Sequence, residues 1–118
     1  MAEPNLTLKI KETSERFTIE DVIVVTDISR TGSGRYCTRL CRDCNKFEEE
    51  VFLEFSSQER YNCKDLISLM FGIAEAECMS RKTNIIVEPN SKEARTLALM
   101  LYASLTDKEW DLQYRESG

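Results

Sequence analysis

Three cysteines in the first half of the chain are the residues best suited to chemistry. Cys37, Cys41 and Cys44 have the spacing C-x3-C-x2-C, and arginines are interleaved with them. Thiolates at such spacing can ligate an iron–sulfur cluster, or a zinc ion for which Cys63 or Cys78 would supply a fourth ligand. One candidate function is therefore a small cysteine-ligated metal protein or a redox sensor.

The same cysteines also fit a structural role. A helix predicted to begin near Thr38 carries apolar side chains at helical spacing on one face. These positions are Leu40, Cys41, Cys44 and Phe47. Because a buried thiol packs like a small hydrophobic side chain, Cys41 and Cys44 fit the core. Cys37 precedes this helix, and a helix N-terminus beside Arg39 would lower the pKa of its thiol. Cys37 is therefore the candidate for modification.

The composition excludes several classes of function. A length of 118 residues suffices for one domain with a single core. The net charge of -5, without a basic stripe, argues against nucleic-acid binding. The chain contains no histidine, which removes Ser-His and Cys-His catalysis and any phosphohistidine. Because paired catalytic carboxylates and a phosphate-binding loop are also missing, we expect a protein that is not an enzyme and holds no cofactor.

The cellular compartment is indicated by hydropathy and by the use of cysteine. No apolar run approaches the roughly 20 residues that a membrane span needs, and the first residues lack the pattern of a signal peptide. The five cysteines are an odd number, which favours reduced thiols over a disulfide framework. We therefore expect a cytoplasmic protein that does not associate with a membrane.

The periodicity of apolar residues predicts the elements that must position these side chains. Strands are predicted at residues 6–10, 17–25, 51–55, 60–63 and 84–88. The strand at 17–25 contains the apolar run Val22–Val25, which we expect to be covered on both faces. A second helix follows the capping pattern of Asn62–Asp65 and ends near Gly72, and a third follows a cap at Asn90 and runs to residue 105.

This order of elements predicts an α+β fold. We expect a two-layer, open-faced sandwich in which an antiparallel four-stranded sheet carries three helices on one face. The domain spans residues 16–106, after an N-terminal extension of residues 1–15 and before a tail of residues 107–118. The extra strand at 6–10 would either add to the sheet edge or pair with a second copy of the chain to form a homodimer.

Two stretches of the chain resemble HPr, the phosphocarrier protein of the bacterial sugar phosphotransferase system. The segment Gly34–Leu40 is similar to the family's active-site loop, Gly-Leu-His-Thr-Arg-Pro, and keeps its Thr-Arg pair as Thr38 and Arg39. The segment Leu66–Ala74 is similar to the family's regulatory helix. The order of elements from about Val22 onward is also that of the family, so the resemblance implies an HPr-like fold.

The resemblance also implies where a functional site lies. In the family, a histidine at the N-terminus of the first helix accepts a phosphoryl group from enzyme I and passes it to enzymes II. Cys37 stands at the position of this histidine, and Leu40 replaces the family's proline. The family's regulatory serine at the start of the second helix matches either Lys64 or Asp65. Without a histidine the chain is not an ordinary phosphocarrier, which points to a regulatory or protein-binding module.

A module of this kind would bind its partner through the first two helices. The residues expected to contact a phosphoryl group or a partner are Cys37, Thr38, Arg39, Asp65, Leu66, Ile67 and Met70. The partner would be of the enzyme I, enzyme II, kinase or transcription-regulator type. Ile67 and Phe71 form a second apolar stripe on the second helix, which indicates either a docking patch or a wider core contact.

Overall fold

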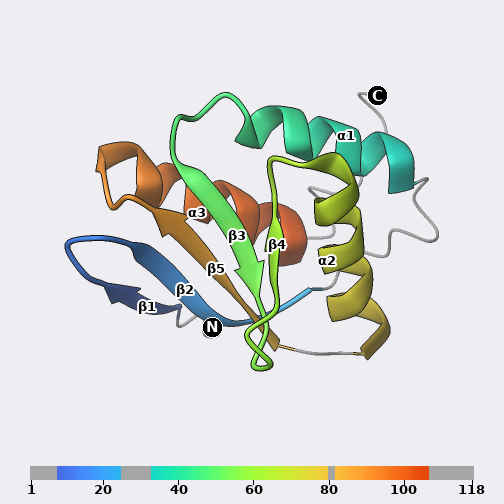
Figure 1. Cartoon of the computed structure of the whole chain (residues 1–118), viewed down its shortest axis with the longest axis horizontal. Coiled ribbons are helices and arrows are strands. Elements are labelled where there is room, and N and C mark those ends of the chain that lie inside the picture. The colour runs from blue at the N-terminus through green and yellow to red at the C-terminus, as the bar shows by residue number, and fades with distance from the viewer. Residues whose placement is uncertain (1–7, 25–32, 80–81, 107–118) are drawn as a thin grey trace, which may run out of the picture.

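Figure 1 shows the computed structural model, which describes residues 8–24, 33–79 and 82–106. Within these residues the elements in chain order are β1 (Lys9–Glu12), β2 (Phe17–Ile23), α1 (Ser33–Cys44), β3 (Glu50–Glu54), β4 (Arg60–Asn62), α2 (Leu66–Met79), β5 (Lys82–Glu88) and α3 (Lys92–Thr106). The predicted α+β class with three helices is therefore confirmed. No helix in the described part of the chain has the length and apolar character needed to cross a membrane.

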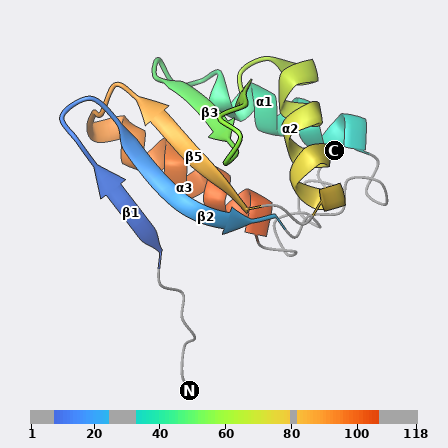
Figure 2. The same ribbon diagram turned by 60° about the horizontal axis from the view of Figure 1, so that its bottom comes forward.

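The described strands form one antiparallel sheet in the order β1-β2-β5-β3-β4. The sheet therefore has five strands, because the N-terminal strand adds to the edge beside β2 (Figure 2). This strand covers Lys9–Glu12 rather than 6–10, and residues 6 and 7 lie outside the described ranges. Its exposed lysines form ion pairs with β2, Lys9 with Asp21 and Lys11 with Glu20. Charged side chains of this kind protect a sheet edge, which favours edge protection over pairing with a second copy.

β5 (Lys82–Glu88) lies in the centre of the sheet and has buried apolar side chains on both of its faces. Ile85 and Val87 are fully buried in the core cluster. Ile86 is also buried but belongs to the opposite face of the sheet, where its register neighbours are Thr18 and Phe52. The main core therefore lies on one face of this strand, and a thinner apolar layer that contains Ile86 lies on the other.

The prediction that the run Val22–Val25 is covered on both faces is wrong at Ile23. Val22 and Val24 are buried, whereas Ile23 is 52% exposed. The pairing of β2 with β5 shifts register between Ile19 and Val22, and β2 ends at Ile23, where the described helices and strands leave that side chain largely exposed. Val25 lies outside the described residues.

α3 lies along β2 and β5 (Figure 2), and its apolar residues at helical spacing face inward. The buried residues are Ala94, Leu97, Ala98, Leu101, Ser104 and Leu105. The cap of this helix is Ser91 and not Asn90, because the amide of Ala94 donates to Ser91 Oγ at 3.2 Å. Asn90 instead donates to the carbonyl of Thr13 at 2.8 Å and ties the β1–β2 turn to the helix.

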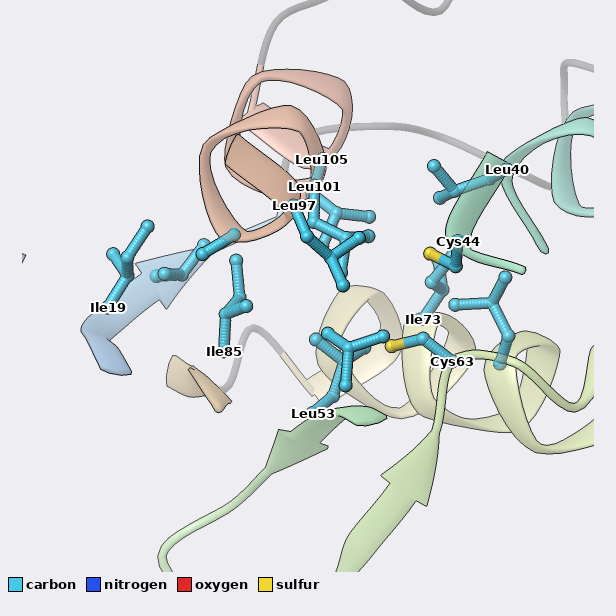
Figure 3. Packing of buried hydrophobic residues seen from close by; sticks show 14 of the residues in the cluster. Ile19, Leu40, Cys44, Leu53, Cys63, Ile73, Ile85, Leu97, Leu101 and Leu105 are labelled. Atoms are coloured by element: carbon cyan, nitrogen blue, oxygen red, sulfur yellow. The ribbon is translucent and has the colours of Figure 1, made fainter. Parts of the chain in front are cut away.

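α1 and α2 complete the core beside α3 (Figure 3). α1 contributes Leu40 and Cys44, and α2 contributes Leu69 and Ile73, all of them fully buried. All three helices therefore share one core with the sheet, an arrangement compatible with a two-layer sandwich.

Gly72 allows α2 to approach the sheet closely. A Cβ atom at Gly72 would lie 3.0 Å from Cβ of Tyr61 and 3.3 Å from Cδ1 of Leu53. Real Cβ atoms rarely have so short a contact with another side chain, so only glycine fits here without displacement of α2 or β4. This glycine fixes the height of α2 above the sheet and thereby the position of its outer face.

Candidate functional site

α1 begins at Ser33, about one turn earlier than the sequence indicated. Cys37 therefore lies inside the helix rather than before it, and its side chain is fully buried. Burial, followed by the nearby Cys41 and Glu77, raises the pKa of the Cys37 thiol to about 12. The expectation of a reactive thiolate at the helix N-terminus is thus wrong, because the thiol faces the core and stays protonated.

The early start of α1 has an identifiable anchor. The ring of Tyr36 is buried, and its hydroxyl lies 2.9 Å from both the carbonyl oxygen and Oγ of Ser104 in α3. This tertiary contact holds the first turns of α1 against the end of α3. The sequence analysis placed the start of this helix near Thr38, because local sequence carries no signal for a partner 68 residues away.

Cys37 and the adjacent Thr38 do not share a face of α1. Thr38 is exposed and Arg39 is half-buried, whereas Cys37 points into the core. Successive helical residues are separated by about 100°, so neighbours in sequence point in different directions. The residues that resemble a phosphotransfer loop are therefore divided between the inside and the outside of the helix.

The surroundings of the other described thiols also raise their pKa and so favour the protonated form. Cys44 and Cys63 are fully buried, and desolvation is the largest cause of their raised pKa, which reaches about 12 for Cys44. The core role predicted for Cys44 is confirmed. Cys41 is half-buried, and burial raises its pKa as well, while its Sγ donates to the carbonyl of Lys64 at 3.3 Å.

The proposed metal ligands do not form a metal site in the described residues. No group of three or more cysteine, aspartate or glutamate side chains there is arranged to hold a metal ion. Cys37, Cys41 and Cys44 face different surroundings along α1, and thiols must lose their protons to bind a metal. The side chain of Cys78 lies outside the described set. The geometry thus gives the metal alternative no support.

A set of hydrogen bonds joins the end of α1 to the start of α2. Nδ2 of Asn45 donates to the carbonyl of Cys41 at 2.9 Å and to the carbonyl of Lys64 at 3.0 Å. Nζ of Lys64 donates in return to the carbonyl of Phe47. Sequence reasoning missed the role of Asn45, which a helix C-terminus followed by an amide side chain could have suggested. These bonds hold the two helices in a defined relative position.

The N-terminus of α2 is capped by Asp65, not by Asn62. The amide of Ser68 donates to Oδ2 of Asp65 at 2.9 Å, the contact of an N-cap with the third helical residue. Asn62 instead forms a turn, in which its Oδ1 accepts from the amide of Lys64 at 2.9 Å. The capping pattern therefore correctly predicts a helix start, but it places the N-cap three residues before its actual position.

α2 exposes two large apolar side chains on its outer face. Leu66 and Met70 are half-buried and pack on the core, whereas Ile67 is 63% and Phe71 64% exposed. Ile67 and Phe71 are four residues apart and so lie on the same face of the helix. The alternative of a wider core contact is therefore wrong for this pair, and the docking-patch interpretation stays open.

The outer face of α1, the helix that packs against α2, is basic. Arg35 and Arg42 are exposed and Arg39 is half-buried, in a chain whose net charge is -5. Arg35, Arg39 and Arg42 recur at helical spacing on α1, which packs against α2. We refer to the whole region as the α1–α2 surface. Its members are Arg35, Thr38, Arg39, Arg42, Leu66, Ile67, Met70 and Phe71.

Comparison with known proteins gives no relative for this chain. No protein-family model matches it, and no curated protein or solved structure matches it significantly. The functional assignment therefore rests on the residues and geometry of the α1–α2 surface.

Proposed function

We propose that this chain is a non-enzymatic, HPr-like protein-binding module of the cytoplasm, which docks on a partner through the α1–α2 surface. The observation that carries the proposal is the exposure of Ile67 and Phe71, at 63% and 64%, beside a basic helix. Large apolar side chains that stay outside the core and border charged residues are typical of docking sites.

Two observations support the HPr-like part of the proposal. From β2 onward the elements follow the order strand, helix, strand, strand, helix, strand, helix, on which the resemblance rests. Asp65 also stands at the start of α2, where the family has its regulatory serine, which favours Asp65 over Lys64 as the matching position. A carboxylate there supplies a permanent negative charge at the helix N-terminus, in part like a phosphorylated serine.

A carrier role is disfavoured by the chemistry of Cys37. A phosphoryl acceptor must reach the donor and attack as a nucleophile, but this thiol is fully buried with a pKa of about 12. The chain also has no histidine. Incubation with phosphoenolpyruvate and enzyme I, followed by mass spectrometry of the intact protein, should therefore show no added phosphoryl group. Stoichiometric phosphorylation would overturn this part of the proposal.

The partner is expected to present an apolar groove with an acidic rim. Ile67 and Phe71 are the anchors for such a groove, and Arg35 and Arg42 lie outside it, where they would face carboxylates. Charges at a rim act mainly on the association rate, so binding should weaken as the salt concentration rises. Proteins of the enzyme I, enzyme II, kinase or transcription-regulator type are the candidates that the resemblance supplies.

The docking proposal can be tested by titration calorimetry with purified enzyme I and with the phosphoryl-accepting domain of an enzyme II. The double variant Ile67→Ser/Phe71→Ser should bind at least one of these roughly tenfold more weakly than the natural chain, as the loss of central apolar anchors implies. Ile23→Ser is the matched control, because Ile23 is an exposed isoleucine on β2, 52% accessible. Equal weakening by both variants, or by neither, would contradict docking at the α1–α2 surface.

A further inference from the structure

The face of the sheet opposite the helices contains a shallow hollow of about 600 Å³, a volume within the range of pockets that hold small ligands. It lies over β2 and β5, the second and third strands of the sheet (Figure 2). Its lining includes Arg16, Thr18, Glu20, Glu54, Asn84 and Ile86. The hollow is separate from the α1–α2 surface, which belongs to the helical layer.

The hollow has a basic end and an acidic end. Arg16 directly precedes β2, and Thr18 and Glu20 follow it at every second position. Because successive side chains of an extended chain point to opposite faces, these three share the open face. Ile86 of β5 is the register partner of Thr18 and lies between the two ends. Four steps of about 3.3 Å separate the charged residues, so their Cα atoms are about 13 Å apart.

Both charged ends have capacity for a further partner. Nη2 of Arg16 lies 2.9 Å from a carboxylate oxygen of Glu88, and a guanidinium has other N–H donors. Glu20 has Lys11 at 3.9 Å, and the Lys11 side chain is 72% exposed. An exposed ion pair of this length contributes little, so an ammonium group of a ligand can take its place.

The middle of the hollow contains a buried hydroxyl group. Thr18 is 6% exposed, and none of the described residues forms a hydrogen bond with its hydroxyl. Buried polar groups nearly always have a hydrogen-bond partner, which a ligand in the hollow would supply. Ile86 beside it is 2% exposed and provides an apolar floor. The middle therefore suits a group that forms hydrogen bonds and carries little charge.

A β-bulge shapes the acidic end. The register of β2 against β5 shifts between Ile19 and Val22, and Asp21 has a φ of 59°, in the left-handed region that side-chain-bearing residues rarely adopt. The Asp21 amide donates to Oδ1 of Asn84 at 3.1 Å, which leaves Nδ2 of Asn84 as a donor for a ligand. Glu54 is the register partner of Asn84 and brings a second carboxylate to this end. Bulges often re-aim side chains next to functional sites.

We propose that the hollow binds a short peptide with free termini, which lies extended along β2. The ammonium group of the peptide pairs with Glu20 and Glu54, and its carboxylate pairs with Arg16. Thr18 and Asn84 form hydrogen bonds with the peptide groups between the two termini. Three extended residues span about 10 Å, which fits between the charged side chains at the two ends. The ligand is thus a zwitterion, matched to the opposite charges of the hollow.

Trialanine is a suitable probe, and its binding can be followed by the backbone amide signals of the full-length, 15N-labelled protein. The amides of Thr18, Glu20 and Asn84 should shift saturably, whereas those of α1 and α2 should not move. N-acetyl-trialanine and trialanine amide each lack one charged end, so each should bind roughly tenfold more weakly. Absence of a saturable shift at these residues, or equal binding of the three peptides, would overturn the proposal.

Two variants test the charged ends from the side of the protein. Arg16→Gln and Glu20→Gln should each weaken trialanine binding roughly tenfold, because each keeps a hydrogen-bonding group but loses its charge. Glu50→Gln is the matched control, since Glu50 is an exposed glutamate on the same face of β3 outside the hollow. Unchanged signals from α1 and α2 verify that each variant is folded. Equal affinity in all variants, or an equal loss in Glu50→Gln, would contradict binding in the hollow.

Discussion

Large apolar side chains are buried on the open face of the sheet, the face opposite the three helices, but exposed on the α1–α2 surface. On the open face, Ile86 is buried at 2% exposure although it lies outside the main core. Phe52, its neighbour in register, has the guanidinium of Arg60 5.1 Å from its ring centroid. Arg60 is held there by Glu54 at 3.0 Å and by Glu88 at 3.8 Å. An ion-paired arginine thus covers an apolar ring on this face.

On the α1–α2 surface the corresponding apolar atoms face solvent. Ile67 and Phe71 are exposed although arginines stand on the adjacent helix. Long charged side chains can cover apolar area, as the guanidinium of Arg60 does over the Phe52 ring on the sheet. The same chain therefore buries Ile86 on the sheet and leaves Ile67 and Phe71 exposed on α2. The exposure of these two side chains is thus specific to the α1–α2 surface and does not follow from the amino-acid composition.

The sharpest test of this contrast compares two isoleucines. Ile86→Ala should lower the free energy of unfolding by about 2–4 kcal/mol, because it leaves a cavity in a packed layer. Ile67→Ala should change it by less than about 0.5 kcal/mol, because its side chain is mostly exposed. Urea unfolding followed by circular dichroism measures both values. Similar losses for the two variants would show that Ile67 is packed like a core residue.

A smaller loss is expected where α2 meets the sheet. Gly72→Ala should destabilise the protein by about 1–3 kcal/mol, since the added methyl meets Tyr61 and α2 must shift. Helix propensity alone would give the opposite sign, a gain of about 1 kcal/mol. Thr96→Ala, at an exposed site of α3, is the control for propensity without a clash. A Gly72→Ala variant more stable than the natural chain would contradict the close contact.

The smallest effect at neutral pH concerns the inner side of α1. The pKa of Cys37 and of Cys44 is raised in the folded state to about 12 from an ordinary value of 9.0. The unfolded chain therefore loses these protons first, so stability is unaffected below about pH 9 and declines between about pH 9 and 12. The free energy of unfolding, measured across this pH range, should decline less steeply in Cys37→Ala than in the natural chain. If the free energy of unfolding depends on pH equally in both proteins, the Cys37 thiol is not buried in the core.

The regular parts of the fold could be predicted because local pattern and tertiary packing agree. The inward stripe of α3 repeats at helical spacing, so periodicity alone identifies Leu97, Leu101 and Leu105. The central strand β5 is likewise recognisable as a short apolar run before Pro89. In both cases each residue's own preference coincides with its place in the core.

The early start of α1 could not be predicted, because it depends on the contact of Tyr36 with Ser104 in a distant helix. Because α1 already begins at Ser33, Cys37 lies in the core instead of at a helix end, and burial raises the pKa of its thiol instead of lowering it. The exposure of Ile67 and Phe71 was also undecided, since a wide apolar stripe does not say which half of it is covered. That answer comes from the sheet and from α1, and it decides the candidate site.

Chemical-shift mapping tests the central claim most directly. Backbone amide signals of the full-length, 15N-labelled protein would be followed as an unlabelled partner that binds it is added. We predict that the largest changes lie on α1 between Arg35 and Arg42 and on α2 between Leu66 and Phe71, with β1 and the open face of the sheet unchanged. Changes concentrated on β1 or around Ile86, with α1 and α2 silent, would contradict the assignment of the α1–α2 surface as the docking site.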